Sequence, residues 1–255
     1  VHIVGLLAVI RRKRPAYQRS KPEVTAENIL NREFTANTVN EKWCTDVTEM
    51  KYGSEGGKAY LSAILDLKGR DIVSFAIGRQ NNNQLVFETF DLAIQKYPDA
   101  HPLFHSDRGF QYTSKQFKDM LEKQGMRQSI SRVGRCIDNG PMKGFWGILK
   151  CEMYYLNHFE TYEELVDAVG QFIHYYNYQR RQHRLNCLAP MNYRSLLMLH
   201  KENQDLISEI LEKTFCFSSV YLTGSGSSLL FVIVMMLLFG DRITYTQYTK
   251  VRQVC

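Results

Sequence analysis

Three strand-like runs between Trp43 and Gly78 follow one another with short turns between them, and this order limits the folds that the chain can adopt. The runs are predicted over residues 43–52, 59–67 and 72–78, with GGK and KGR at the turns. Turns this short connect antiparallel neighbours, whereas parallel strands need a crossover of a dozen or more residues. The sequence therefore predicts an antiparallel meander.

Helical patterns alternate with two further strands after this meander. Apolar periodicity predicts four helices, over residues 83–97, 114–124, 138–156 and 162–181. Pro98 ends the first helix, and the run PLFHSD that follows it is expected to form a strand parallel to the first one. Ser114 is the expected N-cap of the second helix, which leads to a short strand in MRQSIS. The resulting order βββαβαβαα predicts an α/β fold, with a mixed five-stranded sheet and helices on both faces.

The chain has the composition of an ordinary globular protein, with an uneven distribution of charge. It has 255 residues, of which 44% are hydrophobic, so it can bury one sizeable core. The net charge is +6, and residues 1–40 carry seven lysines and arginines against three acidic residues. We interpret this stretch as a basic linker, exposed over residues 11–41, and either a DNA-tracking arm or a plain solvated tether. The start lacks an initiating Met, and we interpret it as the cut end of a longer protein.

The six cysteines are scattered, with no CxxC pair and no histidine cluster at zinc-ligand spacing. We therefore expect free thiols in a reducing compartment.

Two aspartates occupy unusual positions in the predicted sheet. Asp46 lies inside the apolar run of the first strand, and Asp107 lies at the end of the fourth, so the two are expected on adjacent strands. A charge in such a place is costly without a partner, which favours a functional site over the alternative of ordinary strand-end or turn aspartates. Polar neighbours could orient water or phosphate there, or serve only local hydrogen bonds: Thr45, Thr48, His105 and Ser106.

The chain resembles the catalytic core of bacterial insertion-sequence transposases, the retroviral-integrase-like members of the ribonuclease H fold (DDE superfamily). The resemblance covers residues 11–193 and depends on an ordered set of motifs: WCTDVT, HSDRGFQYTS, SRVGRCIDNGPMKGFWGILKCEMYY and YYNYQRR. It implies a polynucleotidyl transferase that cleaves and joins DNA by in-line attack at phosphorus with two Mg²⁺ or Mn²⁺ ions. It also implies that Asp46 bridges both ions and that Asp107 holds one.

The same resemblance implies the partners of the protein. They are DNA, as element ends and as target, and further copies of the chain assembled on that DNA. Neither a membrane nor a small-molecule substrate is expected, and the implied location is the cytoplasm, in association with the nucleoid. Rival hypotheses are a catalytically inactive DNA-binding remnant and a structure-selective nuclease of the ribonuclease H type. The helix-turn-helix that would recognise element ends is expected upstream of Val1.

Lys143 departs from the pattern of this family, which has a glutamate there as the third metal ligand. A protonated lysine has no lone pair to offer a cation, and a positive charge is unfavourable in the first turn of a helix. Glu152 is expected to face away, whereas Asp138 could conceivably reach the site. Three explanations compete for the lysine: a decayed copy, a sequencing or single-codon change, and a protein retained for binding alone.

Five arginines are candidate DNA contacts. Arg132 and Arg135 lie on the loop beside the proposed site, and Arg180, Arg181 and Arg184 alternate with aromatic residues in HYYNYQRRQHR. Arginines interleaved with aromatics suit phosphate contacts combined with stacking, and a solvated basic helix end is the alternative. We expect the apolar residues of the third helix, including Trp146, to pack in the core.

The chain is predicted to consist of three parts: the linker over 1–40, the catalytic core over 41–197 and an atypical tail over 198–255. The tail contains LLFVIVMMLLF, an apolar run of 11 residues that is too short to span a bilayer. We interpret the tail as out-of-frame or fused sequence, with a buried helix or strand as the alternative.

Overall fold

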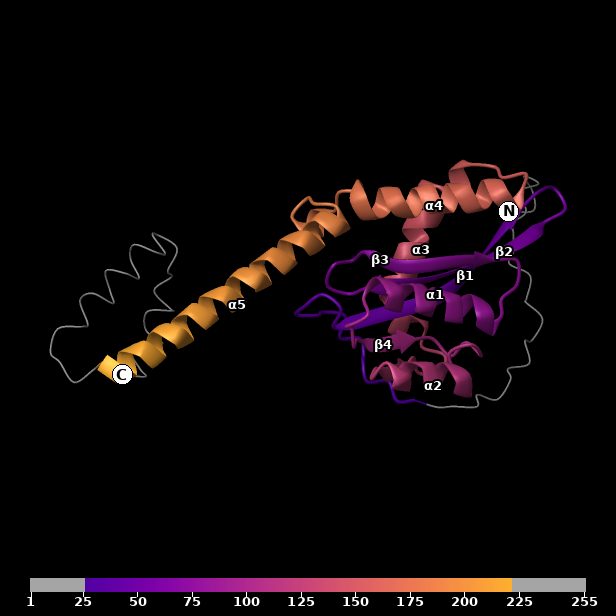
Figure 1. The fold of residues 1–255 in the computed structure, drawn as a ribbon. Coiled ribbons are helices and arrows are strands. Elements are labelled where there is room, and N and C mark those ends of the chain that lie inside the picture. Colours follow the sequence, from indigo (N-terminus) through magenta and orange to yellow (C-terminus); the bar gives the residue numbers. More distant parts are fainter. Residues whose placement is uncertain (1–25, 222–255) are drawn as a thin grey trace, which may run out of the picture. The chain divides into compact units, whose positions relative to one another are not determined.

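The predicted sheet is present in the structure, a computed structural model that describes residues 26–221 (Figure 1). Its strands are β1 (Lys42–Tyr52), β2 (Gly57–Asp66), β3 (Ile72–Gly78), β4 (Leu103–Ser106) and β5 (Arg127–Ile130), in the order β3-β2-β1-β4-β5. The first three strands pair antiparallel, and β4 pairs parallel with both β1 and β5. The mixed five-stranded sheet is therefore confirmed.

The helices follow the predicted order. They are α1 (Asn83–Lys96), α2 (Lys115–Lys123), α3 (Gly140–Glu152), α4 (Tyr162–Tyr178) and α5 (Pro190–Tyr221), with short 3₁₀ turns η2 (Cys136–Asn139), η3 (Tyr154–Leu156) and η4 (His183–Leu185). The predicted cap of α2 is confirmed, because the Ser114 side chain accepts a hydrogen bond from the Phe117 N–H. The helix expected over 138–156 is instead divided into η2, α3 and η3. Pro141 stands in the first turn of α3, and Met153 leaves helical geometry with φ −133°.

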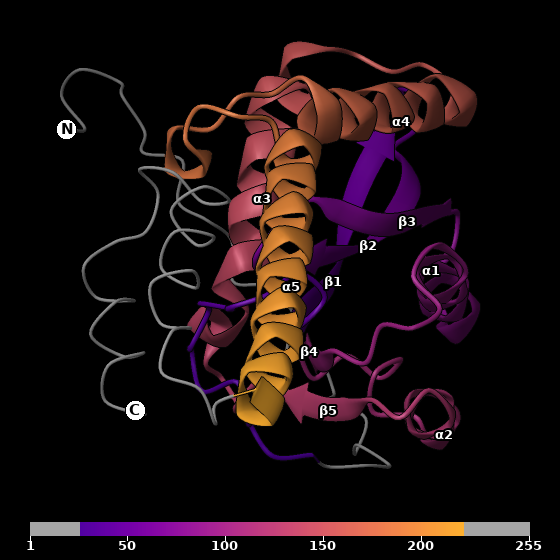
Figure 2. The same ribbon diagram turned by 60° about the vertical axis from the view of Figure 1, so that its left-hand side comes forward.

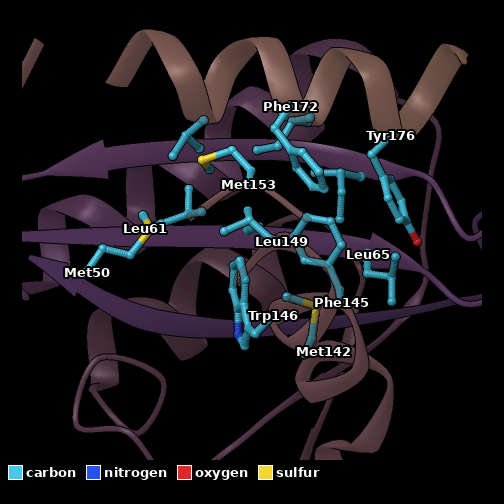
Figure 3. Close-up of a cluster of buried hydrophobic side chains, with 14 of the residues drawn as sticks. Met50, Leu61, Leu65, Met142, Phe145, Trp146, Leu149, Met153, Phe172 and Tyr176 are labelled. Atoms are coloured by element: carbon cyan, nitrogen blue, oxygen red, sulfur yellow. The ribbon is translucent and has the colours of Figure 1, made fainter. Parts of the chain in front are cut away.

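Helices cover both faces of the sheet. On one face, α1 and α2 pack through an apolar cluster that includes Phe90, Phe104 and Phe117, and on the other face lie α3 and α4 (Figures 1 and 2). The second cluster joins Phe145 and Leu149 to residues of the sheet and of α4 (Figure 3). Successive residues of β1 serve opposite faces, because side chains alternate along a strand: Trp43 belongs to the first cluster and Cys44 to the second.

Buried polar contacts attach α4 and the start of α5 to the sheet. The Asn177 amide donates to the Ile72 carbonyl at 2.9 Å and accepts from the Ile72 N–H at 2.8 Å, as a neighbouring strand would. Arg194 is only 2% exposed and donates to Asp71 at 3.1 Å and to Asn40 at 2.6 Å. Arg194 lies within the part of the chain predicted as the catalytic core, residues 41–197, and its burial makes it an integral part of the packed structure.

The described part of the N-terminal stretch differs from the exposed tether that the sequence suggested. Leu30 is 1% exposed and belongs to the cluster beneath α3, and its N–H donates to the Ser129 hydroxyl at 3.0 Å. The Ile130 N–H donates to the Glu27 carbonyl at 3.2 Å, which attaches the segment to β5. Leu30 and these backbone contacts thus anchor the stretch 26–41 to the core, while its other side chains are partly or fully exposed. The basic run that begins at Arg11 lies outside the described residues.

The chain divides into two compact units, residues 1–198 and residues 199–255. In the second unit the structure describes residues 199–221, which are helical, and the side chains of 201–208 are exposed. The apolar run LLFVIVMMLLF lies outside the described residues. Between residues 26 and 221, no helix is both long and apolar enough to cross a bilayer. Three cysteines of this part form no disulfide: Cys44, Cys151 and Cys187.

Candidate functional site

A cleft of about 680 Å³ beside β1 and β4 brings together the three residues at the centre of the sequence analysis. Asp46 reaches it from β1, Asp107 from the end of β4 and Lys143 from the first turn of α3. Further polar residues line the same cleft, namely Asn81, Arg108, Gln111, Arg132, Arg135 and Asn139.

Strand register explains why the two aspartates meet. Cys44 of β1 is paired with His105 of β4, and the strands run parallel. Each aspartate follows its paired residue by two positions, so both side chains point to the same side of the sheet on neighbouring strands about 4.8 Å apart.

The environment of Asp46 is partly desolvated. One carboxylate oxygen accepts from the Val47 N–H at 3.0 Å, and the other accepts from the indole N–H of Trp146 at 3.2 Å. Burial, reinforced by the negative charge of Asp107, raises the pKa of Asp46 to about 7, although the two hydrogen bonds and the charge of Lys143 oppose this rise. Trp146 is 6% exposed and packs in the core as expected, but its contact with Asp46 was not anticipated.

Asp107 is held by a tight turn. Its Oδ1 accepts from the Gly109 N–H at 2.8 Å, and a Cβ at position 109 would lie only 3.0 Å from that oxygen. A side chain at position 109 would therefore crowd the Asp107 carboxylate. Burial raises the pKa of Asp107, while the Gly109 N–H and the charge of Lys143 lower it.

Lys143 is an exposed residue on a firmly packed helix. Its neighbours on α3 are buried at 0%, 2% and 6% exposure: Met142, Phe145 and Trp146. The positive charge of Lys143 lowers the pKa of both Asp46 and Asp107, so it acts on the two carboxylates together.

The residues of the cleft do not fit the three-carboxylate metal site that the family resemblance implies. Within residues 26–221, no group of three or more histidine, cysteine, aspartate or glutamate side chains is placed to hold a metal ion. Asp46 and Asp107 could supply two carboxylates, and the third position contributes an ammonium group.

Asp138 does not supply the missing carboxylate, which corrects the alternative raised from the sequence. It is 0% exposed and accepts from the Arg132 guanidinium at 2.9 and 3.1 Å, from Arg32 at 2.7 Å and from the Asn28 amide at 3.0 Å. The hydrogen bonds from Arg132, followed by those from Arg32, hold the pKa of Asp138 well below its ordinary value. Glu152 pairs with Arg180 and does not line the cleft.

Two polar neighbours of the aspartates, His105 and Thr45, form buried hydrogen bonds. His105 is fully buried between the hydroxyls of Ser129 at 2.9 Å and Ser131 at 3.1 Å, and burial lowers the pKa of His105 to about 4. The Thr45 hydroxyl donates to the Ala63 carbonyl at 3.0 Å. None of the four suggested helpers lines the cleft: Thr45, Thr48, His105 and Ser106.

The five candidate DNA-contacting arginines fall into two groups. Arg132 and Arg135 line the cleft, and Arg132 is also bound to Asp138. The second group lies outside the cleft, where Arg180 forms a two-pronged pair with Glu152 at 2.7 and 2.5 Å and Arg184 donates to Gln182. Arg181 is exposed and also lies outside the cleft.

The sequence reasoning missed several polar residues of the cleft, and Arg108 and Asn139 are two of them. Arg108 directly follows Asp107, and its Nε donates to the Ser131 carbonyl at 2.9 Å, so proximity in the sequence could have indicated it. Asn139 donates to the Thr45 carbonyl at 2.8 Å and thereby ties the start of α3 to β1. Its position in the DNGP motif indicates only the start of a helix.

Comparisons with known proteins identify the family. Two stretches match family models described as integrase core domain, residues 36–136 and residues 143–197. An uncharacterized transposase-like protein of Haemophilus influenzae is 42% identical over 170 residues, which are 67% of this chain and 78% of that protein. The putative transposase InsK of insertion sequence IS150 from Escherichia coli is 39% identical over 193 residues, covering 75% of this chain and 68% of its own length.

Solved structures show the same fold. The HTLV-2 integrase catalytic core domain, determined in complex with magnesium, superposes with a TM-score of 0.51 at 18% identity and covers 63% of this chain and 99% of its own. This likeness confirms the ribonuclease H-like architecture predicted from the motifs. The chain belongs to the bacterial insertion-sequence transposases with an integrase core domain.

Proposed function

We propose that this protein is a transposase catalytic core that binds DNA and whose metal-dependent DNA cleavage and strand transfer are impaired by Lys143. The observation that carries the proposal is the presence of Lys143 in the same cleft as Asp46 and Asp107. The family resemblance implies that two divalent ions, Mg²⁺ or Mn²⁺, would activate the attacking oxygen and stabilise the leaving oxygen.

Electrostatics gives the size of the effect. A divalent ion about 4 Å from a unit charge interacts with it by about 8 kcal/mol at an effective dielectric constant near 20. A glutamate at position 143 would make this interaction attractive, whereas Lys143 makes it repulsive. Asp46 and Asp107 alone must then hold both ions against that repulsion, and we expect the ions to bind too weakly for efficient catalysis.

DNA binding does not require a third carboxylate. Arg108, Arg132 and Arg135 line the cleft and offer guanidinium groups to backbone phosphates. We propose element ends and target DNA as the ligands, self-association on that DNA, and a location in the cytoplasm together with the nucleoid. Such binding should weaken steeply with salt, because counterions are released from the phosphates.

A strand-transfer assay tests the proposal. Labelled duplexes that carry the ends flanking this coding sequence in its genome are incubated with a supercoiled plasmid and Mg²⁺ or Mn²⁺. The unaltered protein should bind the duplex and join none of it, and Lys143→Glu should restore joining. The double variant Lys143→Glu with Asp107→Asn is the matched control and should stay inactive. Robust joining by the unaltered protein would refute the proposal.

The alternative of an inactive DNA-binding remnant predicts a different outcome for one variant. If other positions have also lost their function, Lys143→Glu binds DNA normally and still joins none.

A further inference from the structure

We infer that the Lys143 ammonium takes the place of a bound cation in the cleft, so that a DNA phosphate can approach Asp46 and Asp107 without a divalent ion. The inference rests on the proposed function for the identity of the ligand. It goes beyond the loss of catalysis, because it assigns Lys143 a positive contribution to DNA binding.

The packing of α3 holds Lys143 on the side of the helix that faces the carboxylates. Trp146 lies one turn further along α3, on the same face, and its indole donates to Asp46 at 3.2 Å. Met142, Phe145 and Leu149 are buried at 0–2% exposure, which fixes the rotation of the helix (Figure 3). Lys143 itself is exposed and lines the cleft, so the packed helix fixes the point from which its side chain enters the cleft.

A count of charges shows why this matters for an anionic ligand. With a glutamate at position 143 and all three carboxylates ionised, the centre of the cleft would have a charge of −3 and repel phosphate until cations bound. With Lys143 and both aspartates ionised, the same three positions sum to −1, and the sum is less negative where Asp46, whose pKa is raised to about 7, is protonated. Arg108 and Arg135 add positive charge to the lining. The Lys143 ammonium is thus a permanent positive charge at a place where a glutamate-containing site has positive charge only when a cation is bound.

The arrangement of Arg132 strengthens the role of Lys143. Arg132 lines the cleft, but its guanidinium makes a two-pronged pair with the buried Asp138. Asp138 shares its single negative charge between Arg132 and Arg32, so the charge of Arg132 is partly compensated within the protein. Because Asp138 also holds the guanidinium in place, Arg132 is less able to move toward a phosphate beside Asp46 and Asp107, and this raises the contribution of Lys143.

Fluorescence anisotropy with a labelled duplex tests the inference. Binding is measured at matched ionic strength in EDTA and in Mg²⁺, for the unaltered protein, Lys143→Glu and Lys143→Gln. The unaltered protein should give the same Kd in both buffers within about twofold, with a salt slope larger by about one than that of Lys143→Gln. Lys143→Glu should bind at least about tenfold more weakly in EDTA and recover in Mg²⁺.

Lys123→Glu is the matched control, since it makes the same charge change at an exposed position on α2 outside the cleft. It should stay within about twofold of the unaltered protein in both buffers. Circular dichroism and thermal melting establish that each variant is folded, and the neutral Lys143→Gln keeps the test meaningful if the glutamate variant is unstable.

The inference is overturned if the unaltered protein needs Mg²⁺ to bind DNA, or if Lys143→Glu binds as tightly in EDTA as the unaltered protein does. Either result leaves the proposed function standing. That proposal would fail if the unaltered protein joined DNA strands, or if it bound no DNA in any buffer.

A titration with Mn²⁺ alone gives a readout without DNA. Lys143→Glu should bind Mn²⁺ at least about tenfold more tightly than the unaltered protein, and equal binding by the two would also overturn the inference.

Discussion

Replacement of Arg194 by Met should destabilise the core strongly, and by an amount that depends on pH. The Arg194 side chain is 2% exposed, and it lies 3.1 Å from Asp71 and 4.0 Å from Asp66, which are both fully buried. Removing one partner from a buried charged cluster costs about 3–5 kcal/mol, because the remaining charges stay uncompensated. Methionine fills most of the volume, so the loss of charge should dominate.

The pH dependence follows from Asp66. Burial and the negative charge of Asp71 raise the pKa of Asp66 to about 6, while Arg194 lowers it, so the pKa should rise further in the variant. A carboxyl whose pKa is raised by folding favours the folded state most below its unfolded pKa of about 3.9, and this contribution is lost as the pH rises through the folded pKa. The free energy of unfolding that Arg194→Met loses should therefore reach its maximum at pH 8 and be clearly smaller at pH 5.

Urea denaturation followed by tryptophan fluorescence measures the effect, because Trp43 and Trp146 are both buried. The double variant Arg194→Met with Asp71→Asn should recover part of the lost free energy of unfolding, since it removes one of the uncompensated charges. A loss below about 1 kcal/mol at pH 8, or an equal loss at both pH values, would refute this reasoning.

Two further predictions concern the site and the tail. Trp146→Phe removes the indole N–H that donates to Asp46, and a hydrogen bond to a charged group contributes about 1.5–3 kcal/mol, so the pKa of Asp46 should rise by about one to two units above its value near 7. NMR titration of the side-chain carboxyl carbon measures it, and an unchanged pKa would contradict the assigned contact. Truncation after His200 should raise solubility and leave the thermal midpoint unchanged, because side chains 201–208 are exposed and LLFVIVMMLLF is an aggregation-prone sequence. A truncated protein without a cooperative melting transition would show that the tail is integral to the fold.

The sequence predicted those parts of the fold that depend on local patterns. Short turns and apolar runs determined the antiparallel meander, and a helical crossover determined the parallel pairing of β4 with β1. The placement of Asp46 and Asp107 follows from that pairing alone, because equal offsets on neighbouring parallel strands bring two side chains to the same place. For this reason the order of the strands was sufficient to predict that the two aspartates meet.

Contacts between distant segments left no such pattern. Asp138 was predictable as a residue at a helix start, but Arg32 and Asn28, which bind it, are separated from it by 106 and 110 positions. Leu30 and Ile29 form an isolated apolar pair between polar residues, and only Leu30 is buried, so its burial in the core had no periodic signal. Trp146 shows a related limit, because an apolar helical pattern identifies a core residue and does not indicate the direction of its indole N–H.

The residues that position the site differ from the residue that determines its chemistry. Met142, Phe145 and Leu149 hold α3 against the sheet, whereas position 143 is exposed, so a change from glutamate to lysine there removes no core packing. Substitutions at such surface positions usually alter stability by less than about 0.5 kcal/mol. The fold, the family motifs and the arrangement of Asp46 and Asp107 can thus persist unchanged whichever residue stands at position 143. Family membership therefore predicts the fold and the positions of Asp46 and Asp107, whereas the activity of this chain depends on the chemistry of residue 143.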